Sequence, residues 1–418
     1  MYQAVLKYGK AGDNIKKLLI IASKLSGGGA EHVARNNIEC FLQDSEIKLA
    51  LLTCDKDSSK VYNIDTFIAK DFRKSKNIIL KAIESIYLKH NYLVTKNCLS
   101  EFKPDIIHIH DYIPFSPSML KAVYEYKKQS SCKIIMTHHT YSFICTNDSL
   151  YNYSSCQLCE KCVGKFDKTI IKDNCYNNYI GSIMKYLQKN RMMRYMNGLI
   201  DIHIAPSYFM RDMLLKVNKS YRIEVIFNPC IKEIPQITDN DKDNKLVYFG
   251  RISKEKNILK IADLFSTLET SMKLLIIGTG DQSNELKEII ENSKNNNLIF
   301  INDFLNSDKL YNEIIHAKYF ILPSVWYENS PVSIVEAISL GIVPIVSDIG
   351  GMKELIDYFK IGYSFNPHND NSIMEVLKNI TNENLLPNID NNVILKLNEF
   401  TNENYKDNII KIYGKVIK

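Results

Sequence analysis

Two glutamates, Glu328 and Glu336, flank a helix-start signal in the stretch PSVWYENSPVSIVEAISLG. Ser330 followed by Pro331 predicts that start, because a serine oxygen caps free backbone amides and proline fits the first helical turn. Glu328 then lies in the loop before the helix, and Glu336 lies about a turn and a half inside it. A helix N-terminus binds anions and carboxylates bind hydroxyl groups, so the stretch is typical of a site for a nucleotide sugar. The alternative is a solvated Glu328 and a salt-bridged Glu336.

Two cationic side chains and a run of glycines follow expected strands, where they could bind a diphosphate. Arg251 and Lys256 follow an expected strand at residues 246–250, and both can neutralise phosphate charge. The run SGGGAE follows another expected strand, and its Gly28 and Gly29 let the backbone approach a ligand closely. Neither this run nor the later GTGDQS has the G-x-G-x-x-G spacing, which disfavours a nicotinamide dinucleotide.

Five cysteines form a separate candidate site. Cys156, Cys159 and Cys162 follow C-x-x-C-x-x-C spacing, and Cys145 and Cys175 flank them in a segment with little periodicity. Two-residue gaps let neighbouring thiolates reach one ion, so a structural zinc held by four of the five is one interpretation. Free thiols, a redox-sensitive pair and an iron–sulfur cluster are the alternatives.

The two glutamates need buried strands to hold them. Residues 319–322 form a short apolar run before the loop, and residues 343–346 form another after the helix, which Gly341 ends. Pro344 is tolerable only near the start of its strand. Runs buried on both faces are typical of parallel sheets, whose ligands bind at the carboxyl ends of the strands.

The same alternation of strand and helix fills the chain. Further strands are expected at residues 17–22, 47–53, 106–110, 133–137, 200–205, 224–227, 273–277 and 298–301. The Pro- and Asp-rich residues 228–244 predict a linker. We therefore expect an α/β protein of two doubly wound, Rossmann-like domains that face a cleft. The first would span residues 1–235 and the second 236–400, with a C-terminal helix at 401–418 packing back on the first.

Composition limits the class of protein. The chain has 418 residues, 45% of them hydrophobic and 24% charged, which describes a soluble globular protein of about two domains. It has no apolar run near the ~20 residues of a membrane span and no signal-peptide pattern, so a cytoplasmic protein is expected. Lys and Arg outnumber Asp and Glu 34 to 22 before Gln236, and the totals of 53 and 47 leave 19 to 25 after it.

The first half therefore has a net charge of +12 and the second −6. A basic half suits nucleic acid, a phosphorylated lipid or an anionic membrane, although chance drift in a Lys-rich composition is the alternative. Residues 70–96 and 185–194 are basic and amphipathic, as in helices that lie on membranes, although a core helix with a solvated face has the same pattern. The expected membrane contacts are Lys74, Lys76, Lys81, Lys189, Arg191 and Arg194.

Six motifs in order resemble the retaining glycosyltransferases of family 4, which have the GT-B fold. They are SGGGAE at residue 26, DIIHIHD at 105, FGRISKEKN at 249, IIGTG at 276, PSVWYENSPVSIVEA at 323 and SDIGGMKEL at 347. The cysteine segment resembles a subgroup whose recurring cysteines correspond to Cys145, Cys156, Cys159 and Cys175, with Cys162 as an extra. Two positions depart from the pattern: Thr140 stands where an aspartate is usual, and Asn257 where a glycine is usual.

The resemblance implies a role for each candidate residue. Arg251 and Lys256 would hold the donor diphosphate, Glu336 the ribose hydroxyls, and Glu328 would orient the donor sugar. His139 would lie near the transferred sugar. Gly28 and Gly29 would close over the cleft from the acceptor side. The remaining donor-binding positions would be Gly250, Ser330, Pro331, Gly350 and Gly351.

The resemblance also implies the reaction. A hexosyl group would pass with retention from a UDP- or GDP-sugar to a saccharide or a polyprenyl-diphosphate-linked saccharide, with no metal or other cofactor for catalysis. The enzyme would act in polysaccharide synthesis at the cytoplasmic face of the membrane. Its partners would include an anionic membrane surface but no nucleic acid. A nucleotide-sugar epimerase of the same fold and a non-catalytic nucleotide-sugar-binding protein are the alternatives.

Overall fold

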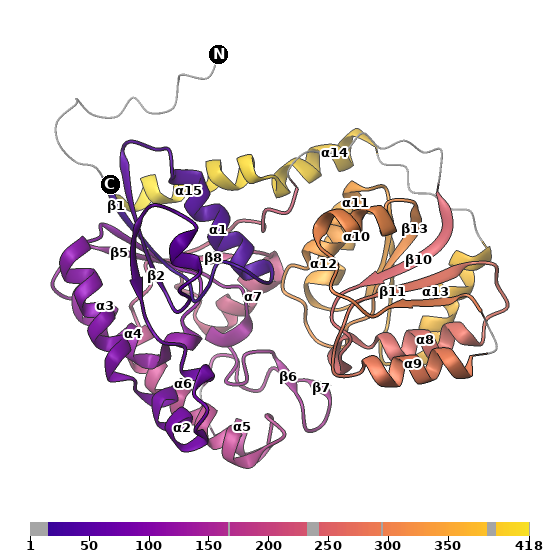
Figure 1. Cartoon of the computed structure of the whole chain (residues 1–418), viewed down its shortest axis with the longest axis horizontal. Helices are drawn as coiled ribbons and strands as arrows, with labels where there is room; N and C mark the ends of the chain where they lie inside the picture. The colour runs from indigo at the N-terminus through magenta and orange to yellow at the C-terminus, as the bar shows by residue number, and fades with distance from the viewer. Residues whose placement is uncertain (1–15, 166–167, 232–241, 294–295, 383–389, 418) are drawn as a thin grey trace. The chain divides into compact units, whose positions relative to one another are not determined.

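The computed structural model describes residues 16–165, 168–231, 242–293, 296–382 and 390–417 (Figure 1). The chain forms two compact units. Unit 1 comprises residues 1–136, 194–201 and 415–418, and unit 2 comprises residues 137–193 and 202–414. The domain boundaries expected at 235 and 400 stay predictions, and most of the expected linker at 228–244 lies outside the described residues.

A seven-stranded sheet has the order β3-β2-β1-β4-β5-β8-β9. Its strands are β1 (Lys16–Ile21), β2 (Ile47–Thr53), β3 (Asp65–Ile68), β4 (Ile106–Ile109), β5 (Lys133–Thr137), β8 (Ile202–Ala205) and β9 (Ile223–Val225). The helices of this part of the chain are α1 (Gly29–Phe41), α2 (Ile78–Ile86), α3 (Lys89–Phe102), α4 (Ser116–Lys127), α6 (Tyr179–Met196) and α7 (Tyr208–Val217). β1 pairs in parallel with both β2 and β4, so later strands are added to the sheet on both sides of β1.

A six-stranded sheet in unit 2 has the order β12-β11-β10-β13-β14-β15, and all of its pairs are parallel. Its strands are β10 (Asp243–Phe249), β11 (Lys273–Ile277), β12 (Leu298–Ile301), β13 (Ala317–Leu322), β14 (Val343–Ser347) and β15 (Tyr363–Phe365). Its helices are α8 (Ile258–Ser266), α9 (Ser283–Asn292), α10 (Ser307–Ile314), α11 (Val332–Ser339), α12 (Gly350–Phe359) and α13 (Asp370–Asn382). The strand order reverses between β10 and β13, which is where ligands bind in such sheets.

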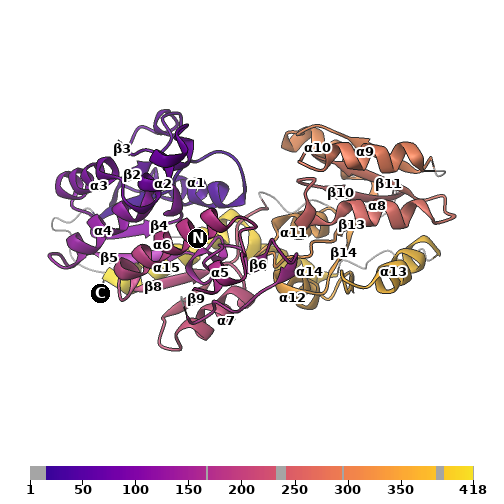
Figure 2. The same cartoon turned by 90° about the horizontal axis from the view of Figure 1, so that it is seen from below.

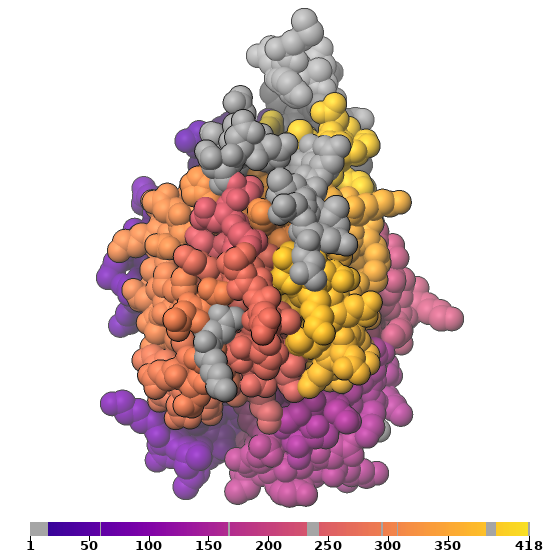
Figure 3. All heavy atoms as spheres, turned by 90° about the vertical axis from the view of Figure 1, so that its right-hand side faces the viewer, coloured from indigo at the N-terminus to yellow at the C-terminus, as the bar shows by residue number. Residues whose placement is uncertain are grey.

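Helices cover both faces of the six-stranded sheet, as Figure 2 shows. α8 packs against α9 and α13, and these segments adjoin on the face seen in Figure 3. Buried side chains from the strands fill the space beneath, among them Tyr248, Tyr319 and Phe320. The core is therefore continuous through the two strands that border the switch point.

The segment after α13 ends the chain with two helices, α14 (Asn391–Leu397) and α15 (Asn402–Ile417). Residues 415–418 belong to unit 1, whereas the rest of α15 belongs to unit 2. Tyr405, Ile409 and Ile412 recur at helical spacing and are all buried. No helix in the described ranges is both long and apolar enough to cross a bilayer.

The structure confirms the expected fold class of two parallel, Rossmann-like sheets. Two short edge strands, β3 and β15, were not expected. The basic stretch at 70–96 is not one helix, because a 3-10 turn (Phe72–Lys74), α2 and α3 divide it. The cysteine segment holds a hairpin of β6 (Tyr151–Asn152) and β7 (Gln157–Leu158), followed by α5 (Thr169–Lys172).

Candidate active site

Two loops meet at the carboxyl ends of β10 and β13. The loop after β10 passes through Gly250 at φ +152°, and the loop after β11 lies so close that a Cβ on Gly278 would be 1.8 Å from the Gly250 carbonyl oxygen. Only glycine fits at residue 278. The amide of Val325, just after β13, donates to the Glu255 carbonyl oxygen over 2.9 Å. These contacts fix the loop that carries Arg251 and Lys256 against the loop that carries Glu328.

Glu328 and Lys256 form a largely buried ion pair. The Lys256 Nζ lies 2.5 Å from Glu328 Oε1, and the two side chains are 16% and 14% exposed. The same oxygen accepts hydrogen bonds from Ser324 Oγ at 2.7 Å and Trp326 Nε1 at 2.6 Å. All three bonds are to Oε1, so the other carboxylate oxygen can accept from a ligand hydroxyl.

These contacts keep Glu328 ionised. Burial acts to raise the pKa of Glu328, but the Lys256 charge and the three hydrogen bonds outweigh it, and the pKa is lowered from its ordinary value. A buried carboxylate with a fixed charge can bind sugar hydroxyls or face positive charge that develops during a reaction.

Arg251 is partnered but accessible. Its guanidinium pairs with Glu255 Oε1 at 2.9 Å, and its side chain is 58% exposed. The guanidinium lies 6.0 Å from the Trp326 ring, and Lys256 Nζ lies 5.8 Å from the same ring. The indole therefore lies near both cations that the sequence assigned to a diphosphate.

Glu336 lies in α11, as predicted, but the start of that helix differs from the prediction. Pro331 is the N-cap residue and makes no side-chain capping bond, so Ser330 lies one residue outside the cap. The prediction that Ser330 caps the helix was wrong, because α11 begins at Val332 and leaves its first amides without a side-chain acceptor. Burial raises the pKa of Glu336.

The loop between β13 and α11 is held from several sides. The Gly351 amide donates to the Glu328 carbonyl oxygen over 2.9 Å, and a Cβ on Gly351 would lie 2.1 Å from the Asn329 carbonyl oxygen. Asn329 Nδ2 donates to the His138 carbonyl oxygen over 2.9 Å, and Ser207 Oγ donates to Asn329 Oδ1 over 3.0 Å. Gly350 and Gly351 thus act by permitting close approach at the start of α12.

His139 directly follows the residue bonded to Asn329. Burial lowers the pKa of His139 to about 4, so its imidazole is neutral near pH 7. The structure therefore brings the segment of His139 to the loop of Glu328.

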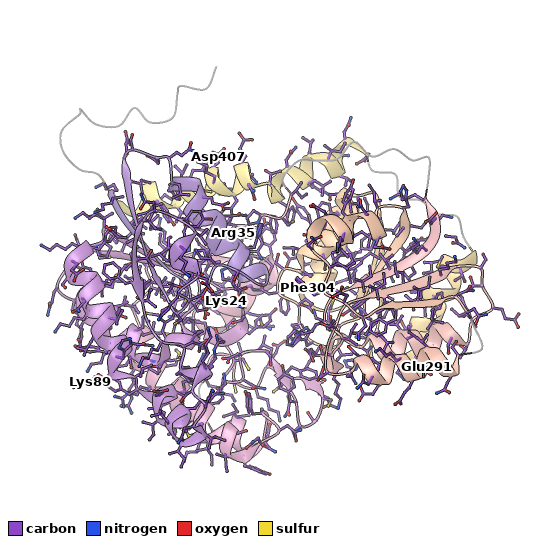
Figure 4. All side chains as sticks on the ribbon, viewed as in Figure 1. Lys24, Arg35, Lys89, Glu291, Phe304 and Asp407 are labelled. Carbon is purple, nitrogen blue, oxygen red and sulfur yellow. The ribbon has the colours of Figure 1, made fainter. Side chains whose placement is uncertain are left out.

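Gly28 and Gly29 belong to unit 1, where they are exposed at the start of α1. Lys24 and Glu31 flank them as an ion pair at 3.4 Å, and Lys24 is labelled in Figure 4. The glycines lie at the carboxyl end of β1, which is the expected edge of the sheet for ligand binding.

The structure describes all five cysteines of the segment at residues 145–175. Among the residues that the structure describes, no group of three His, Cys, Asp or Glu side chains is placed to hold a metal ion, and none of the five cysteines forms a disulfide. Burial raises the pKa of Cys145 to about 11 and of Cys175 to about 12. Zinc remains a prediction from spacing alone, and no step of the proposed reaction uses it.

Sequence reasoning missed three site residues. Trp326 and Ser324 both donate to Glu328, and Asn329 ties the loop to His138. Trp326 is the only tryptophan of the chain, and it lies two residues before Glu328 in the stretch that drew attention first. This position beside Glu328 was the signal in the sequence for Trp326. The sequence held no signal for the hydrogen bonds of Asn329.

Both halves of the chain match families of glycosyltransferases. Residues 27–230 match the family described as Glycosyltransferase Family 4, and residues 231–412 match the one described as Glycosyl transferases group 1. The border between the two matches falls at residue 230/231.

Two curated relatives are similar in sequence. A Klebsiella pneumoniae protein named "Uncharacterized 42.6 kDa protein in cps region" is 23% identical over 288 residues, or 67% of this chain and 68% of that protein. The second, from Campylobacter jejuni, is named N-acetylgalactosamine-N,N'-diacetylbacillosaminyl-diphospho-undecaprenol 4-alpha-N-acetylgalactosaminyltransferase. It is 25% identical over 170 residues, or 40% of this chain and 46% of that protein. The match thus spans less than half of the Campylobacter enzyme.

Two solved structures share the fold. The lipopolysaccharide outer core galactosyltransferase WaaB has a TM-score of 0.66 at 18% identity, with 96% of this chain and 99% of that chain covered. HepE of Anabaena in complex with UDP has a TM-score of 0.66 at 14% identity, with 96% and 100% covered. With the two family matches and the Rossmann-like sheets, these likenesses identify the chain as a glycosyltransferase of the GT-B type, similar to family 4.

Proposed function

We propose that this chain transfers a hexosyl group with retention from a nucleotide-sugar donor to a saccharide or lipid-linked saccharide, in the synthesis of a cell-surface polysaccharide. The observation that carries the proposal is the Lys256–Glu328 pair at the switch point, with Arg251 beside it and the uncapped start of α11 in the same loop. Cations and free amides suit a diphosphate, and an ionised carboxylate suits sugar hydroxyls.

Each residue would have a separate task in donor binding. Arg251, Lys256 and the first amides of α11 would hold the diphosphate. Glu336 would accept from the ribose hydroxyls, and Glu328 would orient the sugar through Oε2. Lys256 has three donor hydrogens, so it can keep its bond to Glu328 and still donate to phosphate.

In the transfer step, the bond between the anomeric carbon and the phosphate oxygen breaks, and a bond to the acceptor oxygen forms on the same face of the sugar. The acceptor proton passes to the departing diphosphate. Negative charge grows on that diphosphate as the bond breaks, and fixed cations and amides stabilise growing charge without reorganising. The ionised Glu328 would face the sugar, which becomes positive as this bond breaks.

The donor and acceptor classes are supported by similar proteins. HepE was solved with UDP, which favours a UDP-sugar over a GDP-sugar. The Campylobacter relative acts on a saccharide linked to diphospho-undecaprenol, and the Klebsiella relative lies in a cps region. We infer a lipid-linked saccharide as acceptor.

We also infer a peripheral position at the cytoplasmic face of the membrane. α2 exposes apolar side chains, with Ile79 68% and Ile83 60% exposed one turn apart, beside the exposed Lys81. The expected contact through Lys189 was wrong. That side chain is buried, and burial lowers its pKa to about 8, because α6 packs Lys189 inward.

Calorimetry with UDP and, separately, GDP tests donor binding. We expect the wild-type chain to bind UDP, and Arg251→Ala to weaken binding by about ten- to a hundredfold through loss of a charge-assisted bond. Lys254→Ala is the matched control, because Lys254 is an exposed cation in the same short turn. A folded wild-type chain that binds neither nucleotide overturns the proposal.

Slow hydrolysis of a UDP-sugar without acceptor tests the reaction itself. Proton NMR of the released sugar should show the donor's configuration first, as retention requires. Conversion of the donor to an epimeric UDP-sugar would instead identify the epimerase alternative, and binding without turnover would identify the non-catalytic one.

A further inference from the structure

The cysteine segment at residues 145–175 reaches the loop that carries Glu328. Glu160, just after the β6–β7 hairpin, accepts through Oε1 from the hydroxyl of Tyr327 over 3.0 Å. Its other oxygen accepts from Lys216 Nζ, at the end of α7, over 2.8 Å. Glu160 therefore bridges Tyr327 to α7, and all three residues lie in unit 2.

We propose that this segment positions the donor site, with Glu160 and Tyr327 as positioning residues that fix the backbone presenting Glu328. Its catalytic consequence rests on the proposed function, since it concerns the carboxylate that would orient the donor sugar. The cysteine segment then acts on the site through hydrogen bonding and packing.

The Tyr327 ring is confined on three sides. Its hydroxyl is bonded to Glu160, and its ring lies 4.8 Å from the Phe209 ring. Gly350 meets the third side, because a Cβ there would lie 2.9 Å from Tyr327 Cδ1. Only glycine at residue 350 leaves room for the ring, so these three contacts hold the side chain of the residue directly before Glu328.

The segment that holds Glu160 is itself braced. The Cys159 amide donates to the Leu150 carbonyl oxygen over 2.9 Å, and the Tyr153 amide donates to the Cys175 carbonyl oxygen over 3.0 Å. Gly164 abuts α7, because a Cβ there would lie 3.0 Å from the Lys216 carbonyl oxygen. A fixed hairpin can transmit position to Tyr327, whereas a loose one could not.

A plain surface contact is the competing explanation. Glu160 is 37% and Lys216 is 53% exposed, and exposed ion pairs contribute little to stability. The two explanations differ in what they predict when the Glu160 contacts are removed. If they are only a surface contact, the surroundings of Trp326 and the rate of donor turnover stay unchanged, whereas a positioning role changes both.

Tyr327→Phe and Glu160→Ala test the proposal, alone and combined, in the full chain. Trp326 is the only tryptophan, so its fluorescence and its quenching by acrylamide report on this loop without any substrate. We expect more quenching in both single variants. Lys161→Ala is the control, because Lys161 pairs with Asp173 inside the same segment.

Donor turnover gives the second measurement. We expect UDP-sugar hydrolysis to slow about tenfold in each single variant, because small misplacements of a reacting group cost rate. UDP affinity should be unchanged, and the double variant should be no slower than either single one, since both single variants remove the Tyr327–Glu160 bond. Additive effects, lost UDP affinity at full rate, or wild-type quenching in both singles would each overturn the proposal.

The two proposals fail separately. If the wild-type chain neither binds UDP nor hydrolyses a UDP-sugar, the proposed function fails, and the Trp326 measurement still decides whether Glu160 positions this loop. Tyr327→Phe keeps the ring that packs on Phe209, so it should fold even where Glu160→Ala does not.

Discussion

Lys256 and Glu328 lie 72 residues apart in the sequence and form an ion pair, with Nζ 2.5 Å from Oε1, at the carboxyl ends of the adjacent strands β10 and β13. The pair joins the two loops on either side of the switch point. A residue expected to hold phosphate thus also fixes the carboxylate expected to hold sugar, so its loss should affect both folding and binding.

Lys256→Ala should lower the free energy of unfolding by roughly 3 kcal/mol, because it leaves Glu328 buried without its counter-ion. Urea unfolding at neutral pH measures the change, with Lys254→Ala as the control. Adding Glu328→Gln to Lys256→Ala should recover part of the loss. A single variant as stable as the wild type would show that the pair contributes nothing.

The Lys256–Glu328 pair should also be sensitive to acid. The pKa of Glu328 is lowered in the folded chain, so its contribution to stability is present above the unfolded pKa of about 4.3 and is lost as pH falls through the folded value. Urea unfolding across a pH series should show a smaller loss of stability on acidification in Glu328→Gln than in the wild type. Equal pH dependence in the two would contradict the assignment.

Glu336→Gln should stabilise the chain at neutral pH while weakening UDP binding. Burial raises the pKa of Glu336, so its contribution favours the folded state below the unfolded pKa and is lost as pH rises through the folded one. At neutral pH the carboxyl is ionised in the unfolded chain, so the raised pKa in the folded chain opposes folding, and its removal should gain about 1 kcal/mol.

Thermal unfolding near pH 7 and near the ordinary glutamate pKa of about 4.3 checks this, since the gain should shrink at the lower pH. Glu354→Gln is the control: the pKa of Glu354 is also raised by burial, but its carboxylate accepts from the amides of Tyr208 and Phe209. That variant should show no gain. A destabilised Glu336→Gln would contradict the expected sign.

Alkylation of the cysteines separates free thiols from zinc ligands. Cys156 and Cys159 are half-buried, whereas Cys145 and Cys175 are buried with raised pKa values. The thiolate is the reactive form, so Cys156 and Cys159 should be modified first. Mass spectrometry with and without a chelator measures this modification. If Cys156 and Cys159 are protected until a chelator is added, and elemental analysis finds one zinc per chain, the zinc prediction is supported.

Vesicle binding tests the membrane position. The chain should sediment with vesicles containing phosphatidylglycerol at low salt and leave them as salt rises, because each Lys or Arg near acidic lipid contributes about 1 kcal/mol. Phosphatidylcholine vesicles should hold it poorly. Ile79→Asn with Ile83→Asn should weaken binding, whereas Leu395→Asn, an equally exposed apolar position in α14, should not. Indifference to lipid charge would rule out this surface.

The sequence was sufficient for the fold because most strands are apolar runs buried on both faces, such as β2 and β11. β3 and β15 escaped detection because both are short edge strands, and in the two together only Phe365 is buried. Lys189 was wrongly predicted to lie at the surface. Its basic segment has the pattern of a solvated helix face, but its side chain is buried.

The site was foreseen only in part. Arg251, Lys256 and Glu328 lie in recognisable loops, which the structure brings together at the carboxyl ends of β10 and β13, and Glu336 lies in α11. The bonds of Tyr327 to Glu160 and of Asn329 to His138 join residues 167 and 191 positions apart. No local pattern encodes such pairs, because they depend on tertiary packing.

The division of the chain into two units bears on its synthesis. The chain passes between unit 1 and unit 2 four times, at residues 136/137, 193/194, 201/202 and 414/415. Domains usually fold as the ribosome releases them, the N-terminal one first. Here β8 and β9, which belong to unit 2, complete the sheet that begins in unit 1, so this sheet cannot be complete until residue 225 has emerged. A nascent chain stalled before that residue should remain a substrate for chaperones.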